Sequence, residues 1–274
     1  MLGLDPKWSI FATMEHRISA KRVAIAAGAA AFLFLSLATL HAQRRFWGLF
    51  DDSDQRQRIV GESEFVFVRI QFGSGRGGFG GYGGWAHDFP DAEEHILQVT
   101  NEATSINSQK LAYVILRMDD EEVFRYPFIY FSEVGEMNMS GREVEILREY
   151  FNRGGFAMVD DFYGPYEFDN FKSEMRRVFP ARNFVELTID HPIFHTFYDI
   201  PTLEGTGLTK PGRSRSPAKY YGYYDEKGRL LMIVNHDNDL GDFWEWIDRP
   251  MYPLPPSTEA LRLGINYFIF SMTH

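Results

Sequence analysis

The chain has 274 residues, and its 45% hydrophobic content is enough to bury the core of one domain. The formal net charge of -10 argues against nucleic acid as a partner, because a chain this acidic is repelled by phosphate backbones. There is no cysteine, so disulfides, thiolate metal sites and thiol nucleophiles are excluded.

The first 42 residues have the pattern of a secretory signal. Basic residues precede an uncharged apolar run over 23–40, and Ala42 supplies a small residue for cleavage. The same run is long enough for an uncleaved membrane anchor, and a buried helix is a third interpretation. We expect an exported protein, periplasmic or secreted, that touches a membrane only through this segment if it is retained. Mixed charges over 43–63 predict a linker, and 64–274 a single domain.

Strand and helix patterns begin after the linker. A run of β-branched and aromatic residues over 65–72 predicts a strand, which leads into a glycine-rich loop over 73–84. The loop contains G-x-G-x-x-G, but no helix opens directly after it. We therefore interpret it as a flexible loop beside a pocket rather than a dinucleotide site. Pro90 and the acidic turn after it predict the start of a helix.

The rest of the chain alternates between predicted strands and helices. Strands are predicted over 111–118, 128–131, 156–159, 185–189, 219–224 and 229–235, and helices after Ser140, over 168–178 and after Ser257. The last two strands flank a turn over 225–228 and so predict a hairpin. This order predicts a three-layer α/β fold: a mainly parallel sheet with helices on both faces and a β-hairpin near the C-terminus. Ligands of such sheets bind outside the carboxyl ends of the strands.

Two adjacent carboxylates, Asp160 and Asp161, directly follow the apolar strand over 156–159. Such a pair is costly unless it is solvated, hydrogen-bonded or bound to a cation. We interpret both as ligand-contacting or catalytic acids. The alternative is that one caps the next turn and the other is solvated.

Two further polar segments are candidates for the pocket. His191 and His195 have a spacing that lets a helix direct both at one metal, but no H-E-x-x-H motif is present. We expect His191 to contact the pocket; the alternative is local packing, with Asp190 capping the helix. The polar run over 235–239 lacks the spacing of a calcium loop, so we interpret it as a lip of the pocket. No metal and no cofactor are expected.

A family resemblance rests on several short motifs in a fixed order: Trp85…Asp88-Phe-Pro90, Tyr126-Pro127-Phe128, Gly154-Gly-Phe156, Asp160-Asp161, Asp190-His-Pro-Ile193, Gly228-Arg229…Asn235, Asp239-Leu-Gly-Asp242 and Arg262-Leu-Gly-Ile-Asn266. In these motifs the chain resembles the bacterial "domain of unknown function 4159" over roughly residues 64–273. That family implies no particular activity.

The chain is also distantly similar to the class I glutamine amidotransferase-like fold, including its trehalose-utilisation type. This resemblance implies an elbow after the strand over 154–159, which carries Asp160-Asp161 where amidotransferases carry cysteine. Without cysteine, glutamine hydrolysis by the thiolate route is impossible here.

Three classes of function follow. The first is an exported module that binds a polar small molecule, such as a carbohydrate. The second is a hydrolase using Asp160 or Asp161 with His191, which requires His191 within ~8 Å of a carboxylate. The third is a structural or envelope-complex protein with a vestigial pocket. The candidate ligand-binding residues are Trp85, Asp88, Asp160, Asp161, Tyr163, His191, Asn235 and Asp239, and the catalytic candidates among them are Asp160, Asp161 and His191.

Overall fold

The computed structural model describes residues 53–73, 84–204 and 216–274. The predicted signal segment and most of the glycine-rich loop lie outside these ranges. The chain divides into two units, Met1–Gln55 and Arg56–His274, and the second contains the fold. Within the described ranges, none of the helices combines the length and the apolarity needed to cross a bilayer.

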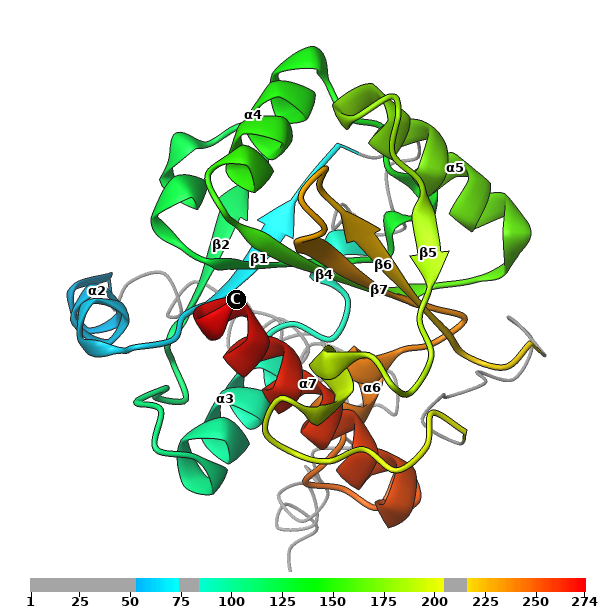
Figure 1. Ribbon diagram of the computed structural model, residues 1–274. Coiled ribbons are helices and arrows are strands. Elements are labelled where there is room, and N and C mark those ends of the chain that lie inside the picture. Colours follow the sequence, from blue (N-terminus) through cyan, green and yellow to red (C-terminus); the bar gives the residue numbers. More distant parts are fainter. Residues whose placement is uncertain (1–52, 74–83, 205–215) are drawn as a thin grey trace, which may run out of the picture. The chain divides into compact units, whose positions relative to one another are not determined.

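A seven-stranded sheet forms the centre of the second unit (Figure 1). Its spatial order is β2-β1-β3-β4-β7-β6-β5, and the strands are β1 (Phe67–Gln71), β2 (Tyr113–Arg117), β3 (Phe128–Ser132), β4 (Phe156–Phe162), β5 (Phe184–Glu186), β6 (Lys219–Tyr224) and β7 (Leu230–His236). All neighbours from β2 to β7 pair in parallel, whereas β6 pairs antiparallel with both β7 and β5. The α/β class, the mainly parallel sheet and the β6–β7 hairpin are therefore confirmed.

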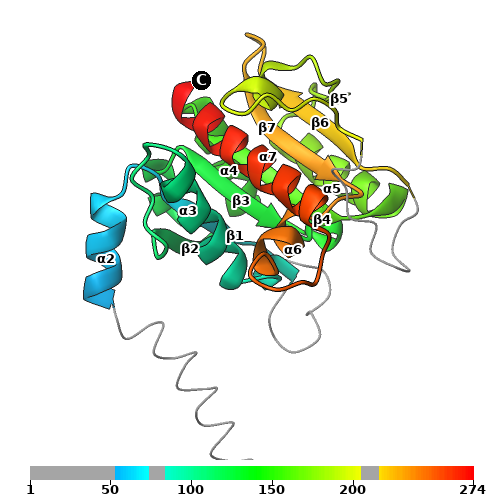
Figure 2. The ribbon, with the colours of Figure 1, turned by 90° about the horizontal axis from the view of Figure 1, so that it is seen from below.

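Helices cover both faces of the sheet (Figures 1 and 2). They are α3 (Asp91–Ala103), α6 (Leu240–Glu245) and α7 (Leu254–Thr273) on one face, and α4 (Gly141–Asn152) and α5 (Gly164–Val178) on the other. Each face has its own apolar core, because alternate side chains of one strand point to opposite sides: Val68 joins the α4–α5 core and Phe67 the α3–α7 core. The ten-residue helix α2 (Ser53–Glu62) precedes β1 and lies within the range predicted as a linker. Short helical turns link the other elements: η2 (Gly84–Ala86), η3 (Glu121–Arg125), η4 (Val134–Glu136) and η5 (Pro192–His195).

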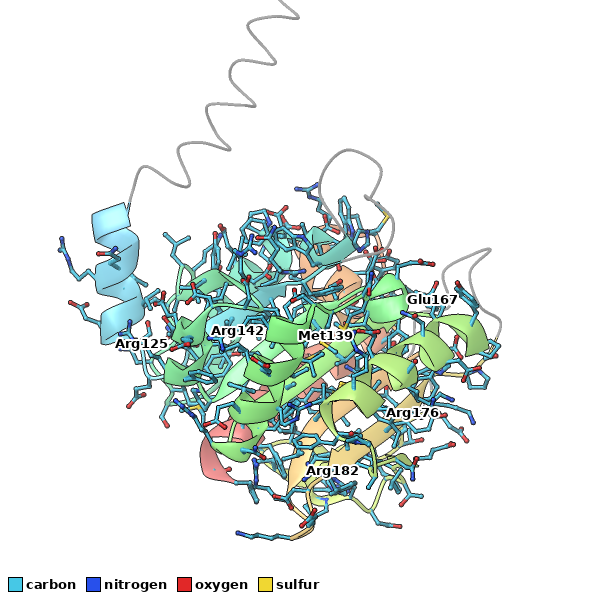
Figure 3. All side chains as sticks on the ribbon, turned by 90° about the horizontal axis from the view of Figure 1, so that it is seen from above. Arg125, Met139, Arg142, Glu167, Arg176 and Arg182 are labelled. Atoms are coloured by element: carbon cyan, nitrogen blue, oxygen red, sulfur yellow. The ribbon has the colours of Figure 1, made fainter. Side chains whose placement is uncertain are left out.

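Helix α4 shows how local sequence fixes an element. The Ser140 side chain accepts from the Glu143 amide, and the Glu143 carboxylate accepts from the Ser140 amide, so the predicted capping box is present. Leu147 is buried on the inner face of this helix. Figure 3 shows α4 and α5 from outside, with Glu167 in the first turn of α5 and Arg176 in its last turn.

The structure corrects three predicted boundaries. Helix α7 begins before Ser257, whose hydroxyl donates to the Pro253 carbonyl instead of capping the helix, since prolines are tolerated in a first turn. Strand β4 does not stop before the two aspartates but includes them. His191, rather than Asp190, is the cap of η5.

Candidate functional site

Acidic side chains from four separate segments collect at one edge of the sheet. This is the carboxyl end of β1, β3, β4 and β7, and the order β2-β1-β3-β4 reverses between β1 and β3, where open α/β sheets place their ligand crevice. The charged residues of this edge, hereafter the acidic site, are His87, Asp88, Glu133, Asp160, Asp161, Asp239 and Asp242.

Strand β4 delivers two of these carboxylates through an irregularity. Its pairing with β7 shifts register between Val159 and Phe162, and Asp161 adopts a left-handed backbone with φ of 54°. Both Asp160 and Asp161 are fully buried. The alternative in which one of them is solvated is therefore wrong, because the bulge keeps both side chains inside.

Asp160 links β4 to helix α6. One carboxylate oxygen, Oδ2, accepts from the Leu240 and Gly241 amides at 2.7 and 3.0 Å. The other oxygen, Oδ1, is buried and has no hydrogen-bond partner among the described residues. Burial, followed by the charge of Asp161, raises the pKa of Asp160 to about 7. Asp160 thus fixes α6 with one oxygen and leaves the other at the site.

His87 lies between two of the carboxylates. Its Nδ1 atom is 2.9 Å from Asp161 Oδ2 and 2.9 Å from Asp88 Oδ1, although neither contact has the angular geometry of a hydrogen bond. Contact with Asp161, and then with Asp88, raises the pKa of His87 to about 11. His87 is 39% exposed, so solvent reaches the acidic site at this ring.

A buried ion pair holds the segment that carries His87 and Asp88. Arg69 on β1 pairs with Glu93 on α3, and both side chains are buried. The Arg69 Nη1 atom also donates to the carbonyls of Trp85 and His87, each at 2.8 Å. The sequence analysis did not identify Arg69 and Glu93 as residues that support the site. A single arginine within an otherwise apolar strand was the pattern that could have indicated a buried ion pair.

Asp239 belongs to the acidic site, and Tyr163 contacts it there. Asp239 is the cap of α6, where its Oδ1 atom accepts from the Asp242 amide at 2.9 Å. The Tyr163 hydroxyl donates to Asp239 Oδ2 at 3.5 Å. Burial, with Asp161 as the largest charge, raises the pKa of Asp239 well above its usual range. Asp242 and Glu133 complete the site and were not among the predicted residues.

Asn235 is turned away from the acidic group. Its Oδ1 atom accepts from the Tyr267 hydroxyl of α7 at 3.2 Å, so its side chain faces the helical layer. Trp85 contributes its carbonyl to Arg69 and packs its ring against the α4–α5 core. The side chains of these two predicted residues therefore contact neighbouring elements and not the carboxylates of the acidic site.

His191 lies at the other end of the sheet. Its Nδ1 accepts from the Ile193 amide, so the neutral ring carries its proton on Nε2, which contacts the Tyr224 hydroxyl at 3.1 Å. Tyr224 pairs with Leu230, the first residue of β7, whereas the aspartates lie beside the end of that strand. At ~3.3 Å per residue the separation along β7 is roughly 13 Å or more.

This placement removes the predicted hydrolase constellation, which required His191 beside Asp160 or Asp161. The physical reason is that the chain turns back after β5 and returns to the amino end of β7. Burial lowers the pKa of His191, as expected for a packed capping residue. His195 pairs instead with Asp199 and the Ile189 carbonyl, so the two histidines do not form a metal pair.

Backbone strain is concentrated at the same edge. The described non-glycine residues with left-handed φ are Asp88, Glu133, Asp161 and Asp237, with φ between 53° and 63°. They follow or end the four strands that deliver the acidic side chains. Conformations of this kind cost ~1–3 kcal/mol each and cluster at functional sites.

Two sets of side chains are spaced as metal ligands. In the set of His87, Asp88, Asp239 and Asp242, one candidate ligand atom from each residue lies within 4.8 Å of all the others. His87 also forms a second such set with Glu133 and Asp161.

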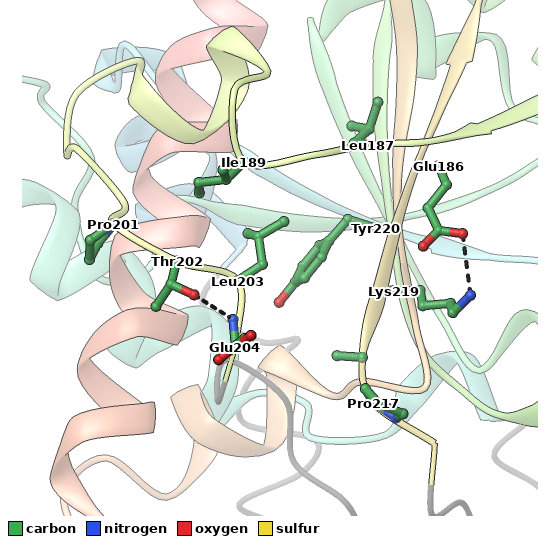
Figure 4. Close-up of a pocket in the computed structure, with 11 residues that line it drawn as sticks. Glu186, Leu187, Ile189, Pro201, Thr202, Leu203, Glu204, Pro217, Lys219 and Tyr220 are labelled. Carbon is green, nitrogen blue, oxygen red and sulfur yellow. Dashed lines mark hydrogen bonds and ion pairs between the residues drawn. The ribbon is translucent and has the colours of Figure 1, made fainter.

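A separate cavity of about 470 Å³ lies beside β5 and β6 (Figure 4). Tyr220, Leu203 and the ion pair between Lys219 and Glu186 line it. None of its lining residues belongs to the acidic site, and one of them, Glu204, directly precedes residues 205–215, which lie outside the described ranges.

Comparison with known proteins agrees with the motifs. The chain belongs to the family described as domain of unknown function (DUF4159), whose model matches residues 66–272. No curated protein matches the chain.

Proposed function

We propose that this member of the family binds a polar small molecule at the carboxyl edge of its sheet, in the acidic site, and has no amidotransferase activity. The observation that carries the proposal is the burial of Asp88, Asp160 and Asp161 at one strand edge, around a partly exposed histidine. Keeping several carboxylates out of water is unfavourable, and proteins retain such arrangements where a ligand compensates the charge.

The charge of the site defines the class of ligand. Six carboxylates and one imidazole give a strongly negative environment, which attracts cationic groups and hydrogen-bond donors and repels anions. A polyhydroxylated molecule that carries an amine fits this chemistry better than a phosphorylated or acidic one. Amino sugars are therefore suitable probes.

We further propose that the fold is related to the amidotransferase-like architecture. The left-handed φ of Asp161, at the end of β4 and three residues before α5 begins, resembles a strained strand-to-helix turn that presents a functional side chain. Aspartate at this turn and the absence of cysteine support a binding role rather than thiolate chemistry.

The test compares three sugars with the same ring and different charge. Glucosamine, glucose and glucuronate are added to the full chain, and thermal unfolding is followed. Glucosamine should raise the melting temperature most and glucuronate least; saturation at a hundred times the dissociation constant stabilises by ~2.7 kcal/mol. Equal shifts for glucosamine and glucuronate, or no shift with any sugar, would contradict the proposal and favour a structural protein with a vestigial pocket.

Variants assign the effect to the site. Asp161→Asn should preserve folding and abolish the glucosamine shift, since Asn keeps the shape and removes the charge. Asp160→Asn should also weaken α6, because Asp160 accepts two α6 amides. The control is Asp169→Asn on α5, where the side chain is 71% exposed and pairs with Lys172 rather than with the acidic site. Normal binding by both site variants would mean that the carboxylates are structural.

We infer that the protein is exported, on the signal pattern of residues 1–42. Fractionation of producing cells should place residues 64–274 outside the cytoplasm, and amino-terminal sequencing should begin at Gln43 if cleavage follows Ala42. A full-length product that remains with membranes after an alkaline wash would contradict cleavage and support the anchor over 23–40.

A further inference from the structure

We propose that His87, Asp88, Asp239 and Asp242 bind one divalent cation of the Mn²⁺ or Zn²⁺ type. The inference deepens the proposed function, on which it rests for the location of the ligand site, by naming an ion held there. The four ligand atoms lie within 4.8 Å of one another. Ligands on opposite sides of such an ion, each bound at ~2.0–2.2 Å, are ~4.4 Å apart, so small side-chain movements complete the coordination.

Asp88 provides the independent observation that points to an ion. It is only 6% exposed, and neither carboxylate oxygen makes a hydrogen bond with the described residues. Oδ1 faces His87, and Oδ2 lies where a side chain on Gly241 would sit, 2.5 Å from the position of a Cβ atom. The ion-pair contact of Asp88 is with His87, itself one of the four proposed ligands, and a buried carboxylate without hydrogen bonds is strongly unfavourable unless a cation compensates its charge.

The other two carboxylates are oriented by hydrogen bonds. Asp242 Oδ2 accepts from the Tyr252 hydroxyl at 3.1 Å, and Asp239 Oδ1 accepts from the Asp242 amide. Asp160 holds the first turn of α6, on which Asp242 lies, through two amide hydrogen bonds. Outer contacts of this kind fix the direction of metal ligands and raise affinity.

The donor set selects the class of metal. Three carboxylates with one imidazole suit Mn²⁺ or Zn²⁺, whereas Mg²⁺ and Ca²⁺ prefer oxygen donors alone. No sequence motif predicts this set, because one pair of ligands precedes α3 and the other pair lies at the start of α6. That is why the sequence led us to expect no metal.

The test is a titration of the full chain after EDTA treatment and removal of the chelator. Binding of Mn²⁺ is followed by loss of the electron paramagnetic resonance signal of the free ion, and binding of Zn²⁺ by competition with a chromophoric chelator. One equivalent per chain is expected. His87→Gln and Asp88→Asn should each weaken binding at least ~10-fold.

Matched controls carry the same chemical changes elsewhere. Asp169→Asn and His195→Gln change exposed residues outside the site and should bind as the unaltered chain does. Circular dichroism confirms that each variant is folded. The proposal is overturned if the folded chain binds neither metal at millimolar concentration, or if His87→Gln and Asp88→Asn bind as tightly as the controls.

The glucosamine measurement separates this proposal from the proposed function. If glucosamine still raises the melting temperature in EDTA and no metal binds, the proposed ion is wrong and the proposed function is retained. Metal binding that His87→Gln weakens, without any glucosamine shift, supports the ion and contradicts the sugar-type ligand.

Discussion

The buried pair of Arg69 and Glu93 yields the sharpest stability prediction. Glu93→Gln leaves the guanidinium buried without its counter-charge, and breaking a buried pair in this way costs ~3–5 kcal/mol. The two carbonyls that accept from Arg69 Nη1 still solvate part of the charge. We therefore expect a loss of about 3 kcal/mol, at the lower end of that range.

Arg69→Met should cost at least as much, since it leaves Glu93 unpaired and removes the donor of both carbonyls. Each hydrogen bond to a charged group contributes ~1.5–3 kcal/mol. The double variant Arg69→Met with Glu93→Gln removes both charges and should be more stable than Arg69→Met alone. It should still lose the positioning of His87, and with it the binding of Mn²⁺.

Urea unfolding of the full chain, analysed as a double-mutant cycle, measures these differences. The control is the exposed pair of Glu149 on α4 and Arg153 directly after that helix, where Glu149→Gln should change stability by less than ~0.5 kcal/mol. The reasoning is refuted if Glu93→Gln costs less than ~1 kcal/mol, or if the double variant loses the sum of the two single losses.

Two further predictions concern packing. Leu147→Ala, on the inner face of α4, should cost ~2–5 kcal/mol in urea unfolding, and a loss below ~0.5 kcal/mol would mean that this face is misplaced. Gly241→Ala places a methyl group against Asp88 Oδ2 and should cost ~1–3 kcal/mol. The same variant should weaken Mn²⁺ binding. Unchanged affinity would show that the Asp88 carboxylate can move away from the added methyl group without losing the ion.

The elements of the fold were largely predictable because local signals specify them. The capping-box residues Ser140 and Glu143 predict the start of α4, and the turn over 225–228 predicts the hairpin. The bulge in β4 was not predictable, because the sequence from Val159 to Phe162 does not indicate that its pairing with β7 shifts register there. That shift is what buries both aspartates.

The site was only partly predictable. Asp160 and Asp161 follow an apolar run, so their place at the strand end is a local property. His191 also follows a strand, but its position depends on a reversal of the chain that local sequence does not specify. The contact of Asp88 with the α6 segment joins residues far apart in the chain, and composition carries no sign of such a pairing.

The position of β7 between β4 and β6 has a consequence for the order of assembly. Asp239 and Asp242 reach the acidic site only after β7 has joined the sheet, although β1 to β4 can pair before it is available. Contacts of such long sequence separation form late, because closing a long loop costs entropy that only the completed contacts repay. A growing or truncated chain therefore escapes the mutual repulsion of these carboxylates, and the affinity for a cation arises only in a chain whose sheet is complete.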